Sequence, residues 1–456
     1  MTGYLREALK RRVSVSARKA LGIFLLAVAM GACRKPAREP VTLSYLRLGW
    51  SQPDEMPVVE LLSQKFMRET GIRLKNVPVP ENTLDQLELS RKFLESGSGP
   101  DVLGIDVIWP GVLDESLMDL RPYFAAELAT MEPQLVASYT VGGKLVAIPY
   151  QVQVGVLEYR TDLLREYGYK HPPATWAELQ SMAERIQAGE RAKGKKDFWG
   201  YVWQGASAEA LTCNALEWQL AEGGGRIIES DHTISVNNPA AIRAWQRAKR
   251  WIGWISPPSV VAYREFDSMA VFDAGGAAFD RVWAGAAKGA KIAGSGQSRL
   301  THWRNTLPFG KTGYTSMPGG PAGRAGTLGG SGLAVFRNTI HPKEAVELVR
   351  FLTHAQTDPS EKSTPDNLPA QPEVYDLASV LGPQSNSEKS SQHKSGLVSR
   401  PSNVTGSAYE KVARAYFTAV HAVLTGQTGA PEAAAELEKQ LIAITGFTTG
   451  PPKTAE

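Results

Sequence analysis

From Val41 onward, segments typical of strands and of helices alternate along the chain, and this alternation is the strongest constraint on its fold. The stretch VTLSYLRLGW (41–50) is typical of a strand, and Met56–Glu69 has the apolar spacing of a helix. IRLKNVPV (72–79) predicts the next strand. DVLGIDVI (101–108) predicts another, apolar enough to be buried on both faces. Alternation of this kind predicts βαβ units with right-handed crossovers.

A second series of strands and helices begins near LVAIPYQVQVGVLEYR. It continues with helices at 175–190 and 208–221, the segment TISV (233–236) and a Trp-rich helix near 239–254. Single hydrophobic cores stop growing at roughly 250 to 300 residues, and the chain has 456. The sequence therefore predicts two α/β units.

A segment rich in Gly and Pro, residues 305–332, precedes the short strand LAVF (333–336) and a helix at His341–His354. Because the core-like pattern resumes in that helix, we interpret the segment as a crossover between the two units. Residues 356–399 are polar and predict long loops, and the tail from 450 to 456 is expected to fray.

The first 32 residues have the pattern of a secretory leader. A basic stretch precedes ten apolar residues, Leu21–Met30, too few to span a bilayer, which takes roughly 20. Gly31-Ala32-Cys33 then resembles a bacterial lipobox, in which the peptidase cuts before a cysteine that carries lipid. An ordinary cleavage site beside a chance cysteine remains the alternative. Residues 33–40 would form a tether.

Charge and cysteine content exclude several classes of function. Without the leader the chain has 44 basic and 45 acidic side chains, so it has no electrostatic footprint for nucleic acid. Cys213 is the only thiol left once Cys33 is lipidated, so no intramolecular disulfide can form, and its apolar neighbours predict a buried, inert thiol. No motif predicts a metal or cofactor. A hydrolase with two catalytic carboxylates stays possible, because such partners can lie far apart in the chain.

Five segments together resemble the extracellular solute-binding proteins of sugar ABC transporters, especially the trehalose- and maltose-binding branch. The resemblance runs from about 41 to 447 and is carried by PDVLGIDVIWPG (100–111), residues 148–168, TWAEL (175–179), residues 200–224, and RPSNVTGSAYEKVARAYFTAVHAVLTGQ (400–427). It implies a periplasmic-binding-protein fold, with two α/β lobes joined by a hinge and a ligand cleft between them. The first lobe would take residues 41–149 and 293–345, and the second 150–292 and 346–449.

The resemblance also implies a set of ligand-binding residues. Glu55 and Asp106 fall where first-lobe carboxylates grip sugar hydroxyls, although Glu55 could instead stabilise a helix N-terminus. Trp283 matches a tryptophan that stacks on the sugar, and Arg400 matches an arginine that reaches into the cleft. Three further candidates are Trp109, Trp203 and Glu209.

Three positions depart from the pattern of that branch. Gln153 stands where relatives carry Asp, Gly285 lies where an aromatic residue is expected, and Ser331 replaces a Trp. The loss of two rings puts the identity of the sugar in doubt.

The expected function is capture of a carbohydrate, such as the disaccharides trehalose or maltose, for an ABC importer. The expected partners are the permease subunits and a membrane that holds the lipid on Cys33, and the protein would be an extracytoplasmic monomer with no cofactor. A sugar-sensing protein for a chemoreceptor would have the same sequence features and remains an alternative.

Overall fold

The computed structural model describes residues 40–47, 56–80, 83–129, 131, 133–284, 311–355, 368–369 and 395–453. The leader, Cys33, Glu55 and Gly285 lie outside these residues. No helix in the described residues is long and apolar enough to cross a membrane.

The described strands form one large mixed sheet and a small hairpin. The main path of the sheet runs β2-β1-β3-β10-β6-β8-β7, with β9 and β11 paired to β6 and β12 paired to β10, while β4 and β5 form the hairpin. The strands are β1 (Thr42–Leu46), β2 (Arg73–Asn76), β3 (Val102–Asp106), β4 (Thr140–Val141), β5 (Lys144–Leu145), β6 (Ile148–Arg160), β7 (Trp199–Val202), β8 (Ala277–Ala284), β9 (Thr312–Ser316), β10 (Arg324–Val335), β11 (Leu368–Pro369) and β12 (Ser395–Val398).

Helices cover both ends of the sheet. They are α2 (Met56–Thr70), α3 (Thr83–Glu95), α4 (Pro110–Leu113), α5 (Ala125–Leu128), α6 (Pro133–Ser138), α7 (Thr161–Glu166), α8 (Trp176–Ala192), α9 (Glu209–Ala221), α10 (Pro239–Trp251), α11 (Glu265–Asp273), α13 (Pro342–Ala355), α15 (Ser402–Thr405), α16 (Tyr409–Leu424) and α17 (Ala430–Thr445). Several helices begin or end at residues typical of helix caps. The Thr175 hydroxyl accepts from the Glu178 amide and begins α8, Asn238 caps α10, and Gly446 ends α17 in the left-handed conformation.

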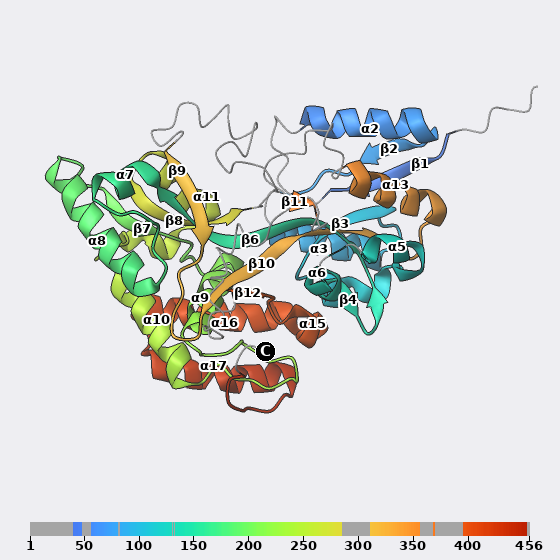
Figure 1. Ribbon diagram of the computed structural model, residues 1–456. Helices are drawn as coiled ribbons and strands as arrows, with labels where there is room; N and C mark the ends of the chain where they lie inside the picture. Colours follow the sequence, from blue (N-terminus) through green and yellow to red (C-terminus); the bar gives the residue numbers. More distant parts are fainter. Residues whose placement is uncertain are drawn as a thin grey trace, which may run out of the picture.

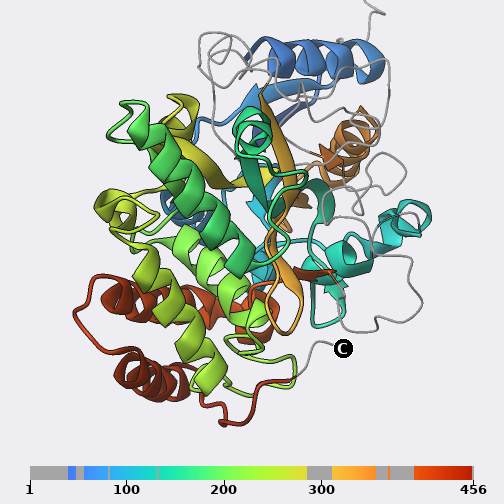
Figure 2. The ribbon, with the colours of Figure 1, turned by 60° about the vertical axis from the view of Figure 1, so that its left-hand side comes forward.

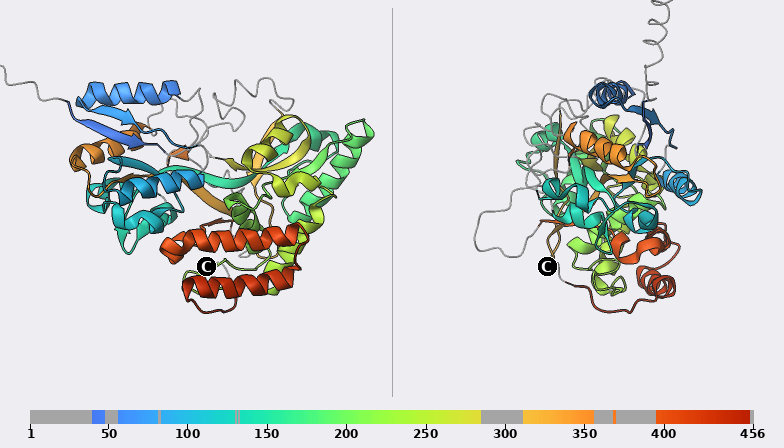
Figure 3. Two further views of the ribbon diagram at one scale, coloured as in Figure 1. Left: turned by 180° about the vertical axis from the view of Figure 1, so that it is seen from behind. Right: turned by 90° about the vertical axis from the view of Figure 1, so that its right-hand side faces the viewer.

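Two hydrophobic cores divide the molecule into two lobes. The first contains side chains of β1, β3, α13 and the segment around Leu117 to Ile148, and the second contains those of α8, α9, α10, α16 and α17. Figure 1 shows the two bodies side by side, with β6 and β10 running between them. α16 and α17 lie side by side beneath the sheet in the turned views (Figures 2 and 3). The predicted α/β architecture with two units is confirmed.

The sheet is mixed, whereas βαβ units alone predict parallel strands. β1 is parallel to β2 and β3, and β7 is parallel to β8, so the prediction holds at the two ends. In the middle, β10 is antiparallel to β3 and β6, and β6 is antiparallel to β8. The two long strands β6 and β10 pass from one core to the other.

Part of the Gly-rich segment before LAVF is a central strand, so the chain crosses between the two cores here as an extended strand. Residues 324–335 form β10, which places Ala325 in the second core and Leu333 in the first. Glycines are needed there because neighbouring side chains fill the space, as where a Cβ on Gly332 would lie 2.7 Å from the Tyr139 ring. The TISV segment forms no extended strand, since Ile234 makes only isolated bridges to Ile228 and Thr449.

Candidate functional site

Arg400 is the centre of a buried cluster of charged and hydroxyl side chains. It follows β12, and only 7% of it is exposed. Its Nη1 donates to Glu209 Oε1 at 3.0 Å, and its Nη2 donates to the Leu328 carbonyl oxygen at 3.3 Å. The same Nη2 lies 3.8 Å from Asp106 Oδ1. Because Asp106 ends β3 and Glu209 begins α9, one guanidinium joins two parts of the chain that are distant in sequence.

Two tyrosines extend this cluster. The Tyr409 hydroxyl, at the start of α16, donates to Glu209 Oε1 at 2.5 Å. The Tyr139 hydroxyl is buried and has no hydrogen-bond partner within the described part of the chain. Asp106, Glu209, Arg400 and Tyr409 are called the acid–arginine cluster below.

The electrostatics of the cluster are those of two carboxylates that share one cation. Burial raises the pKa of Asp106 and the pKa of Glu209, and the charge of Arg400 opposes both rises without cancelling them. Burial alone would lower the pKa of Arg400, but the surrounding acidic groups raise it, so the guanidinium stays charged. Burial also raises the pKa of Tyr139, and Asp106 raises it further, so this hydroxyl keeps its proton.

The strand register places a row of polar and aromatic side chains on one face of the sheet. Ser331 of β10 lies opposite Asp106 of β3 and opposite Gln151 of β6. Gly329 lies opposite Gln153, and Gly155 lies opposite Trp283 of β8. Cross-strand partners share a face, as do alternate residues of one strand. The face therefore carries Asp106, Ser331, Gln151, Gln153 and Trp283, and is called the polar face.

Helix α9 packs on the continuation of the same face. Glu209, Cys213 and Glu217 are spaced four residues apart, so they lie on one side of the helix. The Cys213 carbonyl oxygen accepts a hydrogen bond from Thr327 Oγ1, and Glu217 Oε1 accepts from the Thr327 amide. The helix thus covers one end of the polar face and presents Glu209 to Arg400 at its boundary.

Five of the eight sequence-predicted site residues form two groups. Asp106, Glu209 and Arg400 meet in the acid–arginine cluster, while Gln153 and Trp283 lie on the polar face, both partly exposed.

Two predicted tryptophans lie elsewhere. Trp203 is fully buried in the second core, where its Nε1 donates to Ser256 Oγ. Trp109 is buried in the first core. Their positions favour packing, so neither is included in the proposed site below.

Sequence reasoning missed Gln151, Tyr139 and Tyr409. Gln151 carries a readable signal, because QVQV alternates with the period of a strand and puts it on the same face as Gln153. Its side-chain oxygen accepts a hydrogen bond from Ser331 Oγ at 3.0 Å. The two tyrosines carry no local signal, since only the fold brings them to Asp106 and Glu209.

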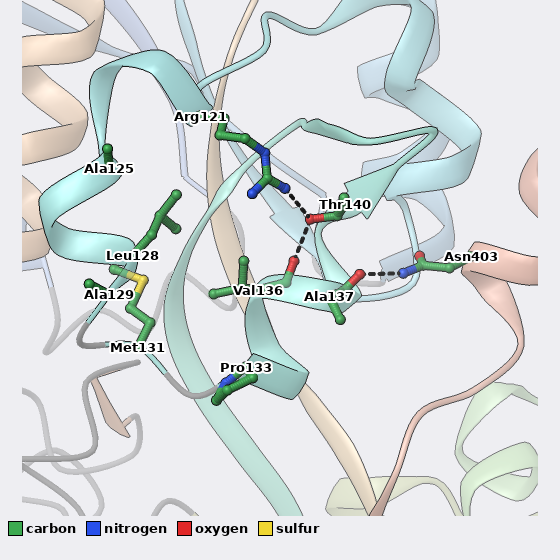
Figure 4. Close-up of a pocket in the computed structure, with 10 residues that line it drawn as sticks. All are labelled: Arg121, Ala125, Leu128, Ala129, Met131, Pro133, Val136, Ala137, Thr140 and Asn403. Carbon is green, nitrogen blue, oxygen red and sulfur yellow. Dashed lines mark hydrogen bonds between the residues drawn. The ribbon is translucent and has the colours of Figure 1, made fainter.

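A cavity in the first lobe is distinct from this site (Figure 4). It has a volume of about 780 Å³, and most of its lining is apolar side chains of α5, α6 and the residues between them. Its polar rim consists of Arg121, which donates to Thr140 Oγ1 at 3.3 Å, and Asn403, which donates to the Ala137 carbonyl oxygen at 2.8 Å. No residue of the acid–arginine cluster or the polar face lines it. Across the described residues, no group of three or more His, Cys, Asp or Glu could hold a metal ion.

Residues 50–358 match the family described as bacterial extracellular solute-binding protein. The chain is 41% identical over 389 residues to a probable ABC transporter-binding protein of Deinococcus radiodurans, covering 84% of this chain and 89% of the relative.

Solved structures agree over most of the chain. The maltose-bound MalE3 of T. maritima is 30% identical, with a TM-score of 0.73 over 89% of this chain and 100% of that structure. The GacH receptor of Streptomyces glaucescens, 20% identical, shares the fold with a TM-score of 0.71 over 90% of this chain and 100% of that structure.

Proposed function

Because the chain belongs to the family of bacterial extracellular solute-binding proteins, we propose that it captures a carbohydrate and delivers it to an ABC importer. The ligand we propose is a sugar of disaccharide size, such as trehalose or maltose. The maltose bound by the T. maritima structure and the transporter named for the Deinococcus relative support this assignment. The family consists of binding proteins and not enzymes, so the chain is not a hydrolase, and it acts outside the cytoplasm.

The observation that carries the proposal is the meeting of the polar face with the acid–arginine cluster. A sugar offers hydroxyl groups around its rim and weakly apolar C–H faces. Carboxylates accept hydrogen bonds from hydroxyl donors with roughly 1.5 to 3 kcal/mol, against about 1 for neutral partners. Asp106 of β3, Gln153 of β6 and Trp283 of β8 supply a charged acceptor, an amide and a ring on one face of the sheet, with β10 between β3 and β6.

The surplus of negative charge also favours a neutral ligand rich in hydroxyl donors. Asp106 and Glu209 together carry one more charge than Arg400 neutralises. The buried Tyr139 hydroxyl, without an acceptor in the described residues, offers a donor for a ligand oxygen. Ser331 is smaller than the Trp that the resemblance implies at this position, so the ligand would differ in shape from trehalose or maltose as that branch binds them.

Closure of two lobes would complete the site. With the lobe boundaries proposed above, Asp106 and Ser331 belong to the first lobe, and Glu209, Trp283 and Arg400 belong to the second. A ligand held by both lobes would shift the equilibrium between an open and a closed form of the protein. Changing the ratio of closed to open protein from 1:99 to 99:1 takes about 5.5 kcal/mol of tighter binding to the closed form. A few charged hydrogen bonds and one stacked ring could supply that amount. The closed form would then dock on the permease.

The proposed anchor is lipid on Cys33, which would keep a monomeric binding protein at the membrane beside its importer. Labelled palmitate should be incorporated into the protein and not into its Cys33→Ser variant, whose sugar affinity should be unchanged. Equal labelling of the Cys33→Ser protein, or no labelling of either protein, would contradict the anchor and leave the sugar site untouched.

Calorimetric titration of the exported, purified protein tests the proposal. It would be titrated with trehalose, maltose, sucrose and longer glucans, and the mixtures would be analysed for products. We expect one sugar to bind saturably and remain intact, with affinity lowered about 10- to 100-fold by Asp106→Ala and by Trp283→Ala. Asp231→Asn, which removes an exposed carboxylate paired with Lys453, is the matched control. Binding of none of these sugars would overturn the carbohydrate assignment.

A further inference from the structure

A fully buried ion pair lies directly beside Trp283. Arg281 Nη2 donates to Glu217 Oε1 at 2.7 Å and Arg281 Nε donates to Oε2 at 3.3 Å, and neither side chain is exposed. Buried pairs carry a desolvation cost that often equals their attraction, so stability alone is a weak reason to place one here.

The geometry around the pair connects it to the tryptophan ring. Arg281 and Trp283 are alternate residues of β8 and share a face, and the guanidinium carbon lies 4.1 Å from the ring centroid. Arg281 Nη1 has no hydrogen-bond acceptor among the residues the structure describes. The Arg281 guanidinium therefore makes a cation–π contact with the Trp283 ring.

Two glycines create the space for this arrangement. A Cβ on Gly155 would lie 2.0 Å from Glu217 Oε1 and 2.4 Å from Arg281 Nη2. A Cβ on Gly329 would lie 2.7 Å from Cζ3 of Trp283. The ring thus has the guanidinium on one side and bare backbone against one edge.

Helix α9 also holds the backbone of β8 at the same point. Asn214 donates to Gln204 Oε1 at 3.0 Å, and Gln204 Nε2 donates to the Arg281 carbonyl oxygen at 2.7 Å. The side chain and the main chain of Arg281 are therefore both attached to α9, which also carries Glu209 of the acid–arginine cluster.

We propose that Glu217 and Arg281 are positioning residues, which lock the Trp283 ring in the orientation that stacks on the sugar. The effect on sugar binding rests on the proposed function, whereas the fixed orientation of the Trp283 ring is a property of the ligand-free protein. A ring that is already fixed loses little rotamer entropy on binding. Glu217 and Arg281 then act on the sugar only through Trp283.

Fluorine NMR of the ligand-free protein labelled with 5-fluorotryptophan tests the locking. The resonance of Trp283, one of eleven tryptophans, is assigned by its loss in Trp283→Phe. We expect Glu217→Gln combined with Arg281→Met to shift and broaden this resonance and to leave the buried tryptophans unchanged. Gln keeps an acceptor for the Thr327 amide, and removing both charges leaves no unpaired ion.

The matched control removes another ion pair of the second lobe. Glu222 pairs with Arg247, whose guanidinium lies over the rings of Trp176 and Trp251 and not over Trp283. Glu222→Gln with Arg247→Met should leave the Trp283 resonance in place. An unchanged Trp283 resonance in the Glu217 and Arg281 variant, or an equal change in the control, would overturn the proposal.

Sugar affinity supplies a second measurement. With the sugar identified by calorimetry, the Glu217 and Arg281 variant should bind about 10-fold more weakly. In a Trp283→Ala background the same change should cost less than about 2-fold, because the ring through which it acts is gone. Equal losses in both backgrounds would contradict a positioning role. If none of the sugars binds, the carbohydrate assignment fails while the NMR result still decides the locking.

Discussion

Arg400 lies 3.8 Å from Asp106, and this pair connects the end of a first-lobe strand to a segment that packs with the second lobe. The strands β6 and β10 also connect the two cores, through backbone pairing. The Arg400–Asp106 contact is between side chains and belongs to the acid–arginine cluster. A ligand between them would compete with, or reinforce, this contact.

Replacing Arg400 should weaken both binding and folding. Arg400→Leu leaves the largely buried carboxylates Asp106 and Glu209 without their shared cation, and such a loss typically costs about 2 to 5 kcal/mol. We expect a loss of sugar affinity of at least about 30-fold in calorimetry and a lower Tm in thermal unfolding. Arg400→Lys keeps the charge and should recover part of the Tm. Affinity within twofold of the original protein would show that Arg400 does not contribute to the site.

The raised pKa values of Asp106 and Glu209 predict a defined pH dependence. A carboxyl whose folded pKa exceeds its unfolded pKa favours folding only while protonated, so its stabilisation is present at low pH and is lost as pH rises through the folded pKa. Asp106→Asn removes this loss. The variant should therefore unfold at a higher temperature than the parent near pH 7, with the difference vanishing near pH 4.

Sugar binding should show the opposite trend with pH. Hydroxyl donors of a sugar favour the ionised carboxylates, so affinity should fall as pH is lowered through the folded pKa values. Calorimetric titration between pH 4 and pH 8 checks whether sugar affinity falls as pH is lowered.

The stability prediction has its own test in thermal unfolding. A higher unfolding temperature of Asp106→Asn that persists at pH 4 would contradict the linkage between protonation and folding.

Cys213 should be inert in the native protein. Burial raises the pKa of its thiol to about 12, so roughly one thiol in 10⁴ is ionised at pH 8, and only the thiolate reacts. A Cys33→Ser protein should therefore release no chromophore from a disulfide reagent until denaturant is added. Rapid reaction under native conditions would mean that α9 opens readily from the sheet.

Gly330 should be far less tolerant of substitution than other glycines with positive φ. Its φ is +121°, and a Cβ there would lie 2.0 Å from the Gln151 carbonyl oxygen. Gly330→Ala should lower the free energy of unfolding by about 4 kcal/mol or more. Gly143, at φ +81° with no atom within 4 Å of a Cβ, is the matched control, and Gly143→Ala should cost about 1 kcal/mol. Urea unfolding measures the free energy of unfolding of both variants. Equal losses would show that backbone strain, and not the contact with the Gln151 carbonyl oxygen, causes the destabilisation.

The sequence predicts the local elements well because their signals are local. Helix α8 follows its Thr175 cap, and β3 matches the buried run DVLGIDVI. The sequence predicts a crossover at the Gly-rich residues of β10 but not that it is a strand, because the glycines are there to fit what neighbouring strands place beside them. A glycine that makes room for Trp283 looks the same in sequence as a glycine in a turn.

The site shows the same limit. Trp203 and Trp283 are equally plausible ligand contacts by residue type, and only the register of β8 and the packing of α9 separate the buried ring from the partly exposed one. Glu217 and Arg281 lie 64 residues apart, so nothing local indicates their pairing. Resemblance to the family indicates Asp106 and Arg400 as candidates, whereas the tyrosines around them depend on long-range packing.

The passage of β10 through both cores has a consequence for how the protein comes apart. Strand β10 pairs with β3 near Val335 and with β12 near Arg324. Unfolding of either lobe would therefore remove hydrogen bonds from a strand that also belongs to the core of the other lobe. The two lobes should therefore unfold in a single cooperative transition, seen as one calorimetric peak. Neither lobe cut out at its boundaries should persist as a folded fragment.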